Sequence, residues 1–467
     1  MTVLVLVVLL AGVIAWWGAR HSHTATDYFA AGRSAGAWLV GIAGTAAAVS
    51  AFTFVGGPGL FAVVGIGSLW ITFSAPLTSA LQCWAIGEPV VELARRHGIL
   101  TPQELIGVRF GGSARAVAAL MIVIGCVAYL AVQARAAAVL GEDFLKVPGA
   151  AAAGVALLAT TAYTALGGMR AGLVADTVQG ATMALLALVL AGAALVAAGG
   201  PAAAFATLRH ARPELLGSFG GAPPGRALAW YLLFCLGTCA QPHYIQKFFF
   251  LRSREQLRAL PAVLTLALAV TLSVWLSVGL AGSALAARGA ITLARPDDLA
   301  PRTMAFLGPW AELVAGVAVL AALMSAAASF LNLAAAAVTR DLPAAFGKPA
   351  RGLAAARVTT AAVALVAAAL GAGSTRTVAM LGIAGWGFFT AALLPVFTLG
   401  LAWNGATGAG AVSAMLAGGG VDILLELNRP HLPAGLEPGL AGAAAGMLLL
   451  IAVSGMSRSR VRSPGLW

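Results

Sequence analysis

Long uninterrupted apolar stretches determine what this chain can fold into. Residues 171–198 and 313–338, for example, are almost entirely apolar, and about 20 such residues cross the hydrocarbon core of a membrane as a helix. Only 9% of the residues are charged, whereas soluble domains average about 25%. The strict apolar–polar alternation of membrane β-barrels is absent from the sequence, so helices must be the spanning elements. The sequence therefore predicts an all-α polytopic protein whose surroundings are the lipid bilayer.

We expect about thirteen membrane spans in this chain. They lie near residues 2–18, 37–60, 65–86, 114–139, 149–167, 172–199, 227–249, 260–286, 309–338, 355–372, 378–402, 405–425 and 438–455. The connections between them are too short to hold an independent soluble core. Residues 1–467 are therefore expected to form a single membrane domain.

The basic residues are spread over the short connections between the spans. With the N-terminus outside, 18 of the 28 Lys and Arg residues fall on the cytoplasmic side, where basic residues concentrate in membrane proteins. We expect a multi-pass protein of the cell (inner) membrane, with its N-terminus outside and its C-terminus cytoplasmic. The net charge of +12 is not gathered into a basic patch with stacking aromatics, which argues against nucleic acid. No obligate protein partner is evident.

Two apolar segments contain residues that interrupt a helix. The second span contains Ser50 and then Gly56-Gly57-Pro58-Gly59, and the seventh span contains Gly237 followed by Gln241-Pro242-His243. Glycine tolerates non-helical angles, and proline cannot donate a helical hydrogen bond. Broken helices leave polar backbone free to bind an ion or solute in the membrane, although a simple kink or helix end is the alternative.

Because five spans separate the two interrupted segments, we expect an inverted repeat. Its halves would be residues 37–202 and 203–404. Residues 1–36 would form a first helix and loop, and residues 405–467 would add two extra helices and a basic tail.

Five segments, spread over residues 27–405, resemble segments of the sodium/solute symporter family, which includes proline, pantothenate and sodium/glucose carriers. They are DYFAAGRS at 27–34, TPQELIGVRF at 101–110, YTALGGMRA at 163–171 continuing to DTVQG at 176–180, QPHYIQKF at 241–248, and SAAAS at 325–329 with TRD at 339–341. The resemblance implies a LeuT-type core of five plus five helices, and uptake of a small organic solute by alternating access, driven by a sodium gradient.

The resemblance also implies a sodium site between the second and ninth helices. Its ligands would be the backbone carbonyls of Ala46, Val49 and Ala322 and the hydroxyl of Ser325; oxygen ligands of this kind suit a hard cation. Members of the family usually carry a second Ser or Thr directly after the first, and here that residue is Ala326. Some members carry Asp or Asn where this chain has Ala48. A proton in place of sodium is therefore the alternative coupling ion.

Two charged residues are candidates for the ion pathway and for gating. Asp176 lies in a long apolar segment, where a charge is costly and usually functional. The resemblance assigns it to the inner ion pathway, and a cap at a cytoplasmic helix end is the alternative. Arg33 is either a gating residue of the family type or an anchor on the cytoplasmic side.

The candidate solute contacts lie on three helices. They are Ser50, Ala51 and Phe54 on the second, Phe234 and Thr238 on the seventh, and Trp386 on the eleventh. Backbone amides near Ser50 are candidates to hold a carboxylate. Proline carriers have an aromatic pair at the positions of Phe234 and Thr238, so a proline substrate is not expected.

Other readings of the chain have less support. Cys235 and Cys239 lie four residues apart, but two small apolar fillers are favoured over a metal or redox pair. His243 is expected to serve a structural turn rather than a zinc site or proton relay. A non-transporting solute sensor would carry a soluble signalling region, an enzyme would need clustered acids or histidines, and a channel would need a symmetric pore motif. We therefore expect a transporter rather than an enzyme.

Overall fold

The computed structural model describes residues 33–457, apart from Lys146, Pro430, His431 and Ala434, together with Val13 and Arg20. The expected first span, 2–18, lies outside the described residues except for Val13. The described residues form a bundle of helices without a strand, and an isolated bridge joins Ala35 to Leu251. Nine helices in this part of the chain are long and apolar enough to cross a membrane, so the total of thirteen spans stays a prediction.

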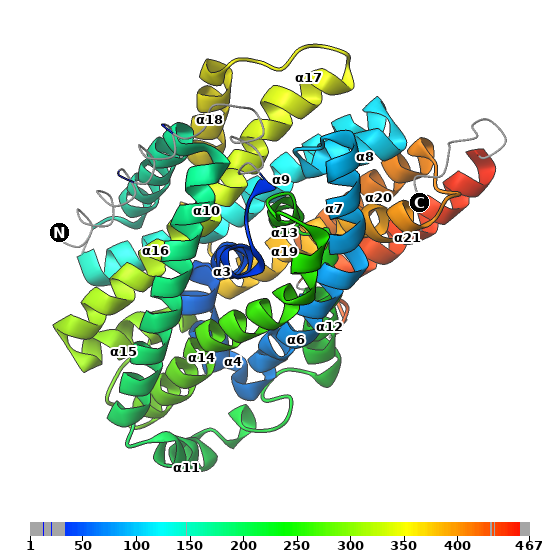
Figure 1. Cartoon of the computed structure of the whole chain (residues 1–467). Coiled ribbons are helices and arrows are strands. Elements are labelled where there is room, and N and C mark those ends of the chain that lie inside the picture. The colour runs from blue at the N-terminus through cyan, green and yellow to red at the C-terminus, as the bar shows by residue number, and fades with distance from the viewer. Residues whose placement is uncertain are drawn as a thin grey trace.

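Eight long helices make up most of the bundle. They are α9 (Gly112–Leu140), α10 (Gly149–Ala197), α14 (Leu260–Ala287), α16 (Pro309–Ala336), α18 (Leu353–Ala372), α19 (Val378–Pro395), α20 (Gly408–Leu427) and α21 (Pro438–Ser457). Short helices cap the two ends of the bundle (Figure 1). At one end lie α7 (Glu88–His97), α8 (Pro102–Phe110) and α17 (Leu342–Ala345), and towards the other end lie α11 (Pro201–Ala211) and α15 (Leu299–Leu307). We call these the α8 end and the α11 end.

The second span is broken, but not where its glycines and proline predict. Helix α3 (Ala37–Ala48) ends before Val49, whose backbone is extended. A short π-helix, η2 (Phe52–Gly56), then leads into α4 (Gly57–Val64), with Pro58 in the first turn of α4. Proline fits a first helical turn because no intrahelical donor is needed there. The expected break is therefore present, and it falls at Val49 and Ser50 rather than at Gly56–Gly59.

The glycines of this segment serve close packing. A methyl group on Gly57 would lie 2.2 Å from the Trp275 ring, and one on Gly56 would lie 2.9 Å from the backbone nitrogen of Ala379. Their small size therefore brings α4 against α14 and α19. The chain then continues through η3 (Gly65–Leu69), α5 (Trp70–Phe73), α6 (Ala75–Leu81) and the π-helix η4 (Gln82–Gly87) to α7.

The seventh span is also broken, as its sequence predicts. Helix α12 (Pro224–Gly237) passes into a single 3-10 turn, η7 (Thr238–Ala240), and the extended residue Gln241 separates this turn from α13 (Pro242–Phe248). The Gln241 side-chain amide donates to the Gly237 carbonyl (3.1 Å) and to the Trp386 carbonyl (3.3 Å). This side chain thus bridges the gap in the seventh span and joins it to α19.

Backbone hydrogen bonds connect the start of the second span to the end of the seventh span. Ala35, just before α3, donates to the Phe250 carbonyl (3.0 Å), and Arg252 donates to the Ala35 carbonyl (2.8 Å). The Gln256 side chain accepts from the amide of Ala37 (2.9 Å). We call these contacts between residues 35–37 and 250–256 the α3–α13 link.

The expected spans 149–167 and 172–199 lie in the single helix α10. A straight helix of this length would extend about 74 Å, more than twice the thickness of the hydrocarbon core. A straight helix crosses a membrane only once, so the two crossings expected for these 49 residues stay a prediction. The remaining elements are η5 (Gly141–Leu145), η6 (Pro213–Leu215), η8 (Arg254–Arg258), η9 (Pro296–Asp298), η10 (Ala337–Asp341) and η11 (Val396–Gly400).

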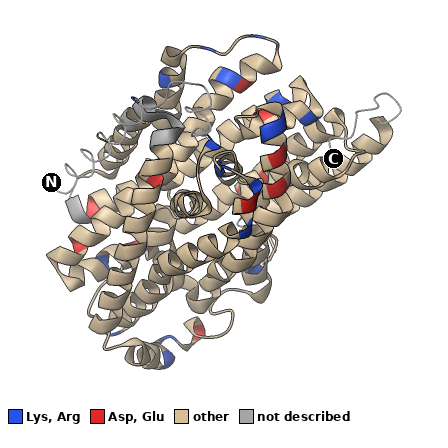
Figure 2. Cartoon of the chain, in the orientation of Figure 1, with Lys and Arg blue, Asp and Glu red and all other residues tan. Residues whose placement is uncertain are grey.

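Charged residues are sparse along the long helices and gather around α7, α8 and the ends of the bundle (Figure 2). At the α8 end, Thr101 caps α8 by accepting from the amide of Glu104 (3.1 Å), and its hydroxyl donates to Asp341 (2.9 Å). Arg115 of α9 also donates to Asp341 (2.6 Å), and Arg340 pairs with Glu104 (3.1 Å). The segments 101–110 and 339–341 thus fasten α8 to the ends of α9 and α16.

Glycine at position 418 is required by the packing of α20 against α19. A methyl group there would lie 2.0 Å from the Ala391 carbonyl oxygen, and a contact with backbone cannot be relieved by a side-chain rotation. We expect Gly418→Ala to destabilise the protein by about 1–3 kcal/mol, measured as a lower thermal midpoint in detergent. Gly420→Ala, on the same helix with open space around it, should leave the midpoint unchanged or raise it.

Candidate ion and solute site

A cavity lies beside the break in the second span. It contains about 490 Å³ of space unoccupied by atoms, part of which is open to the surroundings. Its wall comes from the segments around both broken helices, from α5, α6 and α14, and from Tyr129 of α9 and Trp386 of α19. The lining residues are Ala48, Val49, Phe52, Thr53, Ile71, Thr72, Ser74, Ala75, Thr78, Tyr129, Phe234, Tyr244, Leu268, Leu272, Trp275 and Trp386.

Stacked aromatic rings form one side of this cavity. Phe234 lies between Phe52 (6.0 Å between ring centroids, 7° between planes) and Trp386 (4.7 Å, 20°). Trp275 meets Phe52 edge-on, and Tyr244 meets Trp386 edge-on. The described lining includes hydroxyl groups but no Asp, Glu, Lys or Arg side chain. Such a surface suits a solute with an apolar or methylated part and no net negative charge.

The break frees backbone carbonyls at the end of α3. In a continuous helix, the carbonyls of residues 47–49 would accept from the amides of residues 51–53. Here the Ala51 amide donates to the Gln133 side chain (3.2 Å), the Phe52 amide to the Ser50 hydroxyl (3.2 Å) and the Thr53 amide to the Ser50 carbonyl (2.9 Å). The last carbonyls of α3 therefore lack their helical donors and are available to a cation.

The same bonds change the role expected for the amides near Ser50. The backbone N–H groups of Ala51 and Phe52 already donate hydrogen bonds within the protein, so they are not free to hold a carboxylate. Ser50 is fully buried and is also hydrogen-bonded to Tyr129. Ser50 and Ala51 thus shape the break, and neither lines the described cavity.

A buried charged group lies beside the expected sodium ligands. Asp176 of α10 accepts from the Ser325 hydroxyl of α16 (2.6 Å) through one oxygen and from the Lys247 ammonium of α13 (2.5 Å) through the other. The Asp176 and Lys247 side chains are only 3% and 7% exposed. Because Asp176 lies within α10 rather than at its end, the alternative of a helix cap is wrong.

The other expected sodium ligands are buried between the same helices. Ala46 and Ala322 are fully buried and Val49 is 1% exposed. A methyl group on Gly180 of α10 would lie 3.1 Å from the side chain of Ala46, so α10 passes directly against the end of α3. The Ser325 hydroxyl gives its proton to Asp176 and keeps its lone pairs for a cation. The residues present therefore fit a sodium ion by the chemistry of their oxygens.

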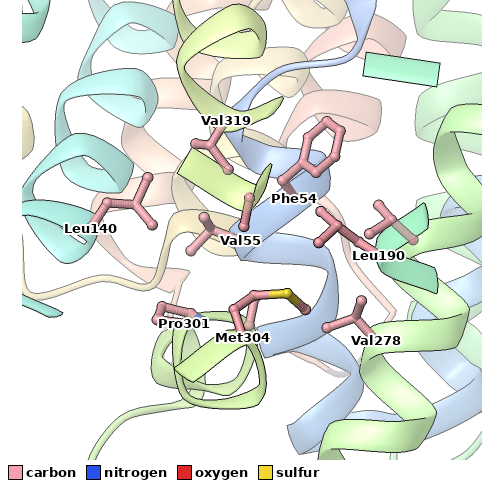
Figure 3. A pocket seen from close by; sticks show the side chains of 11 residues that line it. Phe54, Val55, Leu140, Leu190, Val278, Pro301, Met304 and Val319 are labelled. Atoms are coloured by element: carbon pink, nitrogen blue, oxygen red, sulfur yellow. The ribbon is translucent and has the colours of Figure 1, made fainter. Parts of the chain in front are cut away.

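Phe54 does not belong to the cavity that contains Phe234 and Trp386. Its ring points into a second, apolar cavity of about 310 Å³ (Figure 3). Phe52 and Phe54 are two residues apart, so they face nearly opposite sides of the helical segment. Phe52 rather than Phe54 therefore lines the cavity that contains Phe234 and Trp386, and a solute contact of Phe54 stays a prediction. The second cavity is lined by Phe54, Val55, Leu140, Leu190, Val274, Val278, Ala300, Pro301, Met304, Ala315 and Val319.

The remaining candidates lie in different surroundings. Thr238 is 1% exposed, and its hydroxyl has no hydrogen-bond partner among the described residues. Arg33 adopts a positive φ of 53° and donates to the Ile99 carbonyl (2.8 Å), and its role in gating or anchoring stays a prediction. His243 is buried against the rings of Tyr244 and Phe330, so it packs within an aromatic cluster. Groups of acids, cysteines or histidines that could hold a metal are absent from the described residues.

Sequence reasoning missed several residues that the structure brings to the site. Lys247, near the end of the expected span 227–249, has no role in the sequence analysis, but it is 6% exposed and pairs with Asp176. The cost of burying a lone carboxylate is a signal that could have found it, because such a residue needs a nearby cation. Tyr129, Tyr244 and Trp275 carry no comparable signal, since aromatic residues are common in apolar helices.

Asp297, between α14 and α15, caps the start of α19 at the α11 end. It is 2% exposed and accepts from the Val378 amide (2.9 Å). Burial raises the pKa of Asp297 to about 6, against the lowering effects of the Val378 bond and of Arg135 and Arg295. A raised pKa favours the folded state below the unfolded value of about 3.9, and this contribution is lost as the pH rises through about 6.

We expect Asp297→Asn to remove this pH dependence. The thermal midpoint of the variant, relative to that of the natural protein, should increase as the pH rises from about 4 to above 6. Measuring both midpoints across this range in the same detergent checks the prediction. A constant difference between the two proteins would contradict it.

A bundle of membrane helices, two of which break beside a shared cavity, defines a secondary transporter. The sequence model of the Sodium:solute symporter family matches residues 28–418, and the chain belongs to this family. It is a multi-pass membrane protein that transports a small solute together with sodium.

Characterised relatives agree with this assignment, and a solved structure shares the fold. The chain is 26% identical over 422 residues to the osmoregulated proline transporter OpuE of Bacillus subtilis, covering 87% of this chain and 84% of that protein. It is 26% identical over 430 residues to the sodium/pantothenate symporter of Haemophilus influenzae, covering 89% and 87%. A Na+-coupled sialic acid symporter in a substrate-bound outward-open state shares the fold, with a TM-score of 0.78, 17% identity and 97% coverage of both chains.

Proposed function

We propose that sodium binds where the end of α3 meets Ser325 of α16. Its ligands are the carbonyls of Ala46, Val49 and Ala322 and the Ser325 hydroxyl. The observation that carries the proposal is the loss of helical donors to the carbonyls of residues 47–49, which leaves the Val49 carbonyl free, together with a Ser325 hydroxyl already oriented by Asp176. Oxygen ligands of this kind suit a hard monovalent cation.

Asp176 has a supporting role in this proposal. Its charge is neutralised by Lys247, and its hydrogen bond fixes the direction of the Ser325 hydroxyl. The hydroxyl therefore presents its lone pairs rather than its proton to the ion. Its contact with the proposed ligand Ser325 supports its place in the ion pathway.

The solute proposed here is a small zwitterion or a neutral molecule with an apolar ring or methyl groups. The rings of Phe234 and Trp386 would hold that apolar part, and the hydroxyls of Ser74, Thr78 and Tyr129 would hold its polar part. No cationic side chain lines the described cavity, and a lone carboxylate would lose its hydration without compensation. Zwitterions with an apolar ring or methyl groups are therefore expected to bind better than pantothenate, a carboxylate without a cationic group.

Uptake into proteoliposomes tests the function. With an inward sodium gradient, vesicles containing the protein should accumulate one or more labelled solutes from a panel of zwitterions, sugars and carboxylates. Replacing sodium by potassium should abolish the accumulation. Uptake that ignores sodium and follows a proton gradient would contradict the proposal.

The proposed sodium ligand is tested by Ser325→Ala. Loss of a ligand oxygen should raise the sodium concentration for half-maximal uptake by roughly tenfold or more, corresponding to about 1.4 kcal/mol. The control is Ser283→Ala on α14, which removes a buried hydroxyl that has no partner among the described residues. An unchanged sodium dependence in Ser325→Ala would exclude this hydroxyl as a ligand.

A further inference from the structure

A buried carboxyl group lies outside the proposed ion and solute site. Asp422 is on α20, a helix of the apolar kind that crosses membranes, and it is only 2% exposed. Its Oδ1 atom has no hydrogen-bond partner within the described part of the chain. Ionisable residues in membrane helices are costly and usually functional, so this carboxyl needs an explanation.

The carboxyl group points at the backbone of a helix that contributes to the solute cavity. A methyl group on Gly387 of α19 would lie 3.5 Å from Oδ1 of Asp422, and one on Gly442 of α21 would lie 3.4 Å from the Asp422 side chain. Gly387 also packs directly on Gly439 of α21. Asp422 thus occupies the seam of α19, α20 and α21, next to the residue that follows Trp386.

The cations nearest this seam are committed to other acids. Arg376 donates to Glu426 (2.8 Å), and Arg429 donates to both Glu426 and Glu437 (2.6 Å each). The groups that act electrostatically on Asp422 are therefore Glu426 and Glu437, which oppose its ionisation, and Arg429, which favours it. Arg226 acts on Glu437 from the start of α12.

Asp422 forms no ion pair with the other described residues. Arg376 and Arg429 are paired with Glu426 and Glu437, and Arg226 acts on Glu437. A third carboxylate one turn deeper in α20 would be both unpaired and desolvated, which is strongly unfavourable. A neutral carboxylic acid would instead have a proton to donate to a backbone oxygen of the seam.

We propose that Asp422 is a proton-binding site in the seam of α19, α20 and α21. It holds a proton at neutral pH, and release of that proton slows transport. Ionisation places an unpaired charge against the backbone of α19 at Gly387, beside the cavity residue Trp386. The bound ligand is a proton rather than sodium, because one carboxyl group supplies too few oxygen atoms for a metal ion. This site is separate from the proposed sodium ligands.

Infrared difference spectroscopy tests the proposal. The natural protein at neutral pH should show the carbonyl stretching band of a protonated carboxylic acid, and Asp422→Asn should lose that band. The matched control is Glu92→Gln, which removes an acid of α7 paired with Arg96 on the surface (2.6 Å). This control should lose no such band. A natural protein without a band that depends on Asp422, or a band that disappears on adding sodium at constant pH, would overturn the proposal.

Uptake measurements test the functional half. Asp422→Asn should transport at a rate close to that of the natural protein at neutral pH. When the pH is raised, the natural protein should lose activity severalfold more than the variant does. Equal losses in both proteins would overturn the link to transport. Asp422→Leu provides a second neutral variant, and failure of both variants to fold beside a normal Glu92→Gln would show that the ionised carboxylate is required.

Discussion

Replacing Asp176 with alanine is expected to lower the free energy of unfolding by about 3–5 kcal/mol, because it leaves a buried ammonium group without a counter-charge. Lys247 has a side chain only 7% exposed and lies 2.5 Å from Asp176. The variant should show a much lower thermal midpoint in detergent, and the unpaired lysine should be the cause.

A double-variant cycle separates the pair from other effects. Adding Lys247→Met to Asp176→Ala removes the unpaired charge, so the double variant should recover most of the lost stability. Stability losses that simply add would show that the two side chains do not interact energetically.

The same double variant separates structure from coupling. Its stability should be close to that of the natural protein, but the Ser325 hydroxyl has lost the acceptor that orients it. We therefore expect its sodium affinity in uptake assays to remain low. Full recovery of both properties would mean that Asp176 only balances the charge of Lys247.

Replacing Trp386 with alanine is expected to have a comparably large effect on solute binding. The indole ring stacks on Phe234, lies edge-on to Tyr244 and donates to the Leu233 carbonyl (3.1 Å). Its loss enlarges the cavity and costs about 3–5 kcal/mol of stability. The thermal stabilisation produced by a transported solute should disappear as well.

Two comparisons make this second prediction specific. Trp386→Phe keeps a ring beside Phe234 and should retain part of the solute-induced stabilisation. Trp84→Ala removes a tryptophan that is 68% exposed on the surface of the bundle, and it should leave solute binding unchanged. Solute stabilisation that persists in Trp386→Ala would place the solute elsewhere.

The sequence predicts the class of fold well because lipid imposes strict rules on backbone hydrogen bonding. Apolar length identifies the long helices, and the segment from Gly237 to His243 marks the second break. The first break illustrates the limit of such rules. Pro58 is compatible with a helix start, and Gly56 and Gly57 are small because Trp275 and Ala379 lie against them. These neighbours are more than 200 residues away in sequence, so local patterns do not predict their packing.

The site shows the same limit at the level of single side chains. The sequence identifies both Ser325 and Asp176 as candidates, but their hydrogen bond joins two residues that are 149 positions apart in the sequence. To choose between Phe52 and Phe54 as the cavity residue, one must know which side of the helix each residue faces. Both lie in the π-helix η2, whose wider turn changes the direction of its side chains. The partner of Asp176 depends on how α13 packs against α10.

The α3–α13 link has a mechanical consequence. Because residues 35 and 37 are hydrogen-bonded to residues 250–256, the half-helices α3 and α13 are tied together at their α8 end, while their broken ends border the ion and solute site. During alternating access, the half-helices α3 and α13 should therefore tilt together about Val49 and Gln241. Opening towards the α8 end would then move both half-helices in a single step.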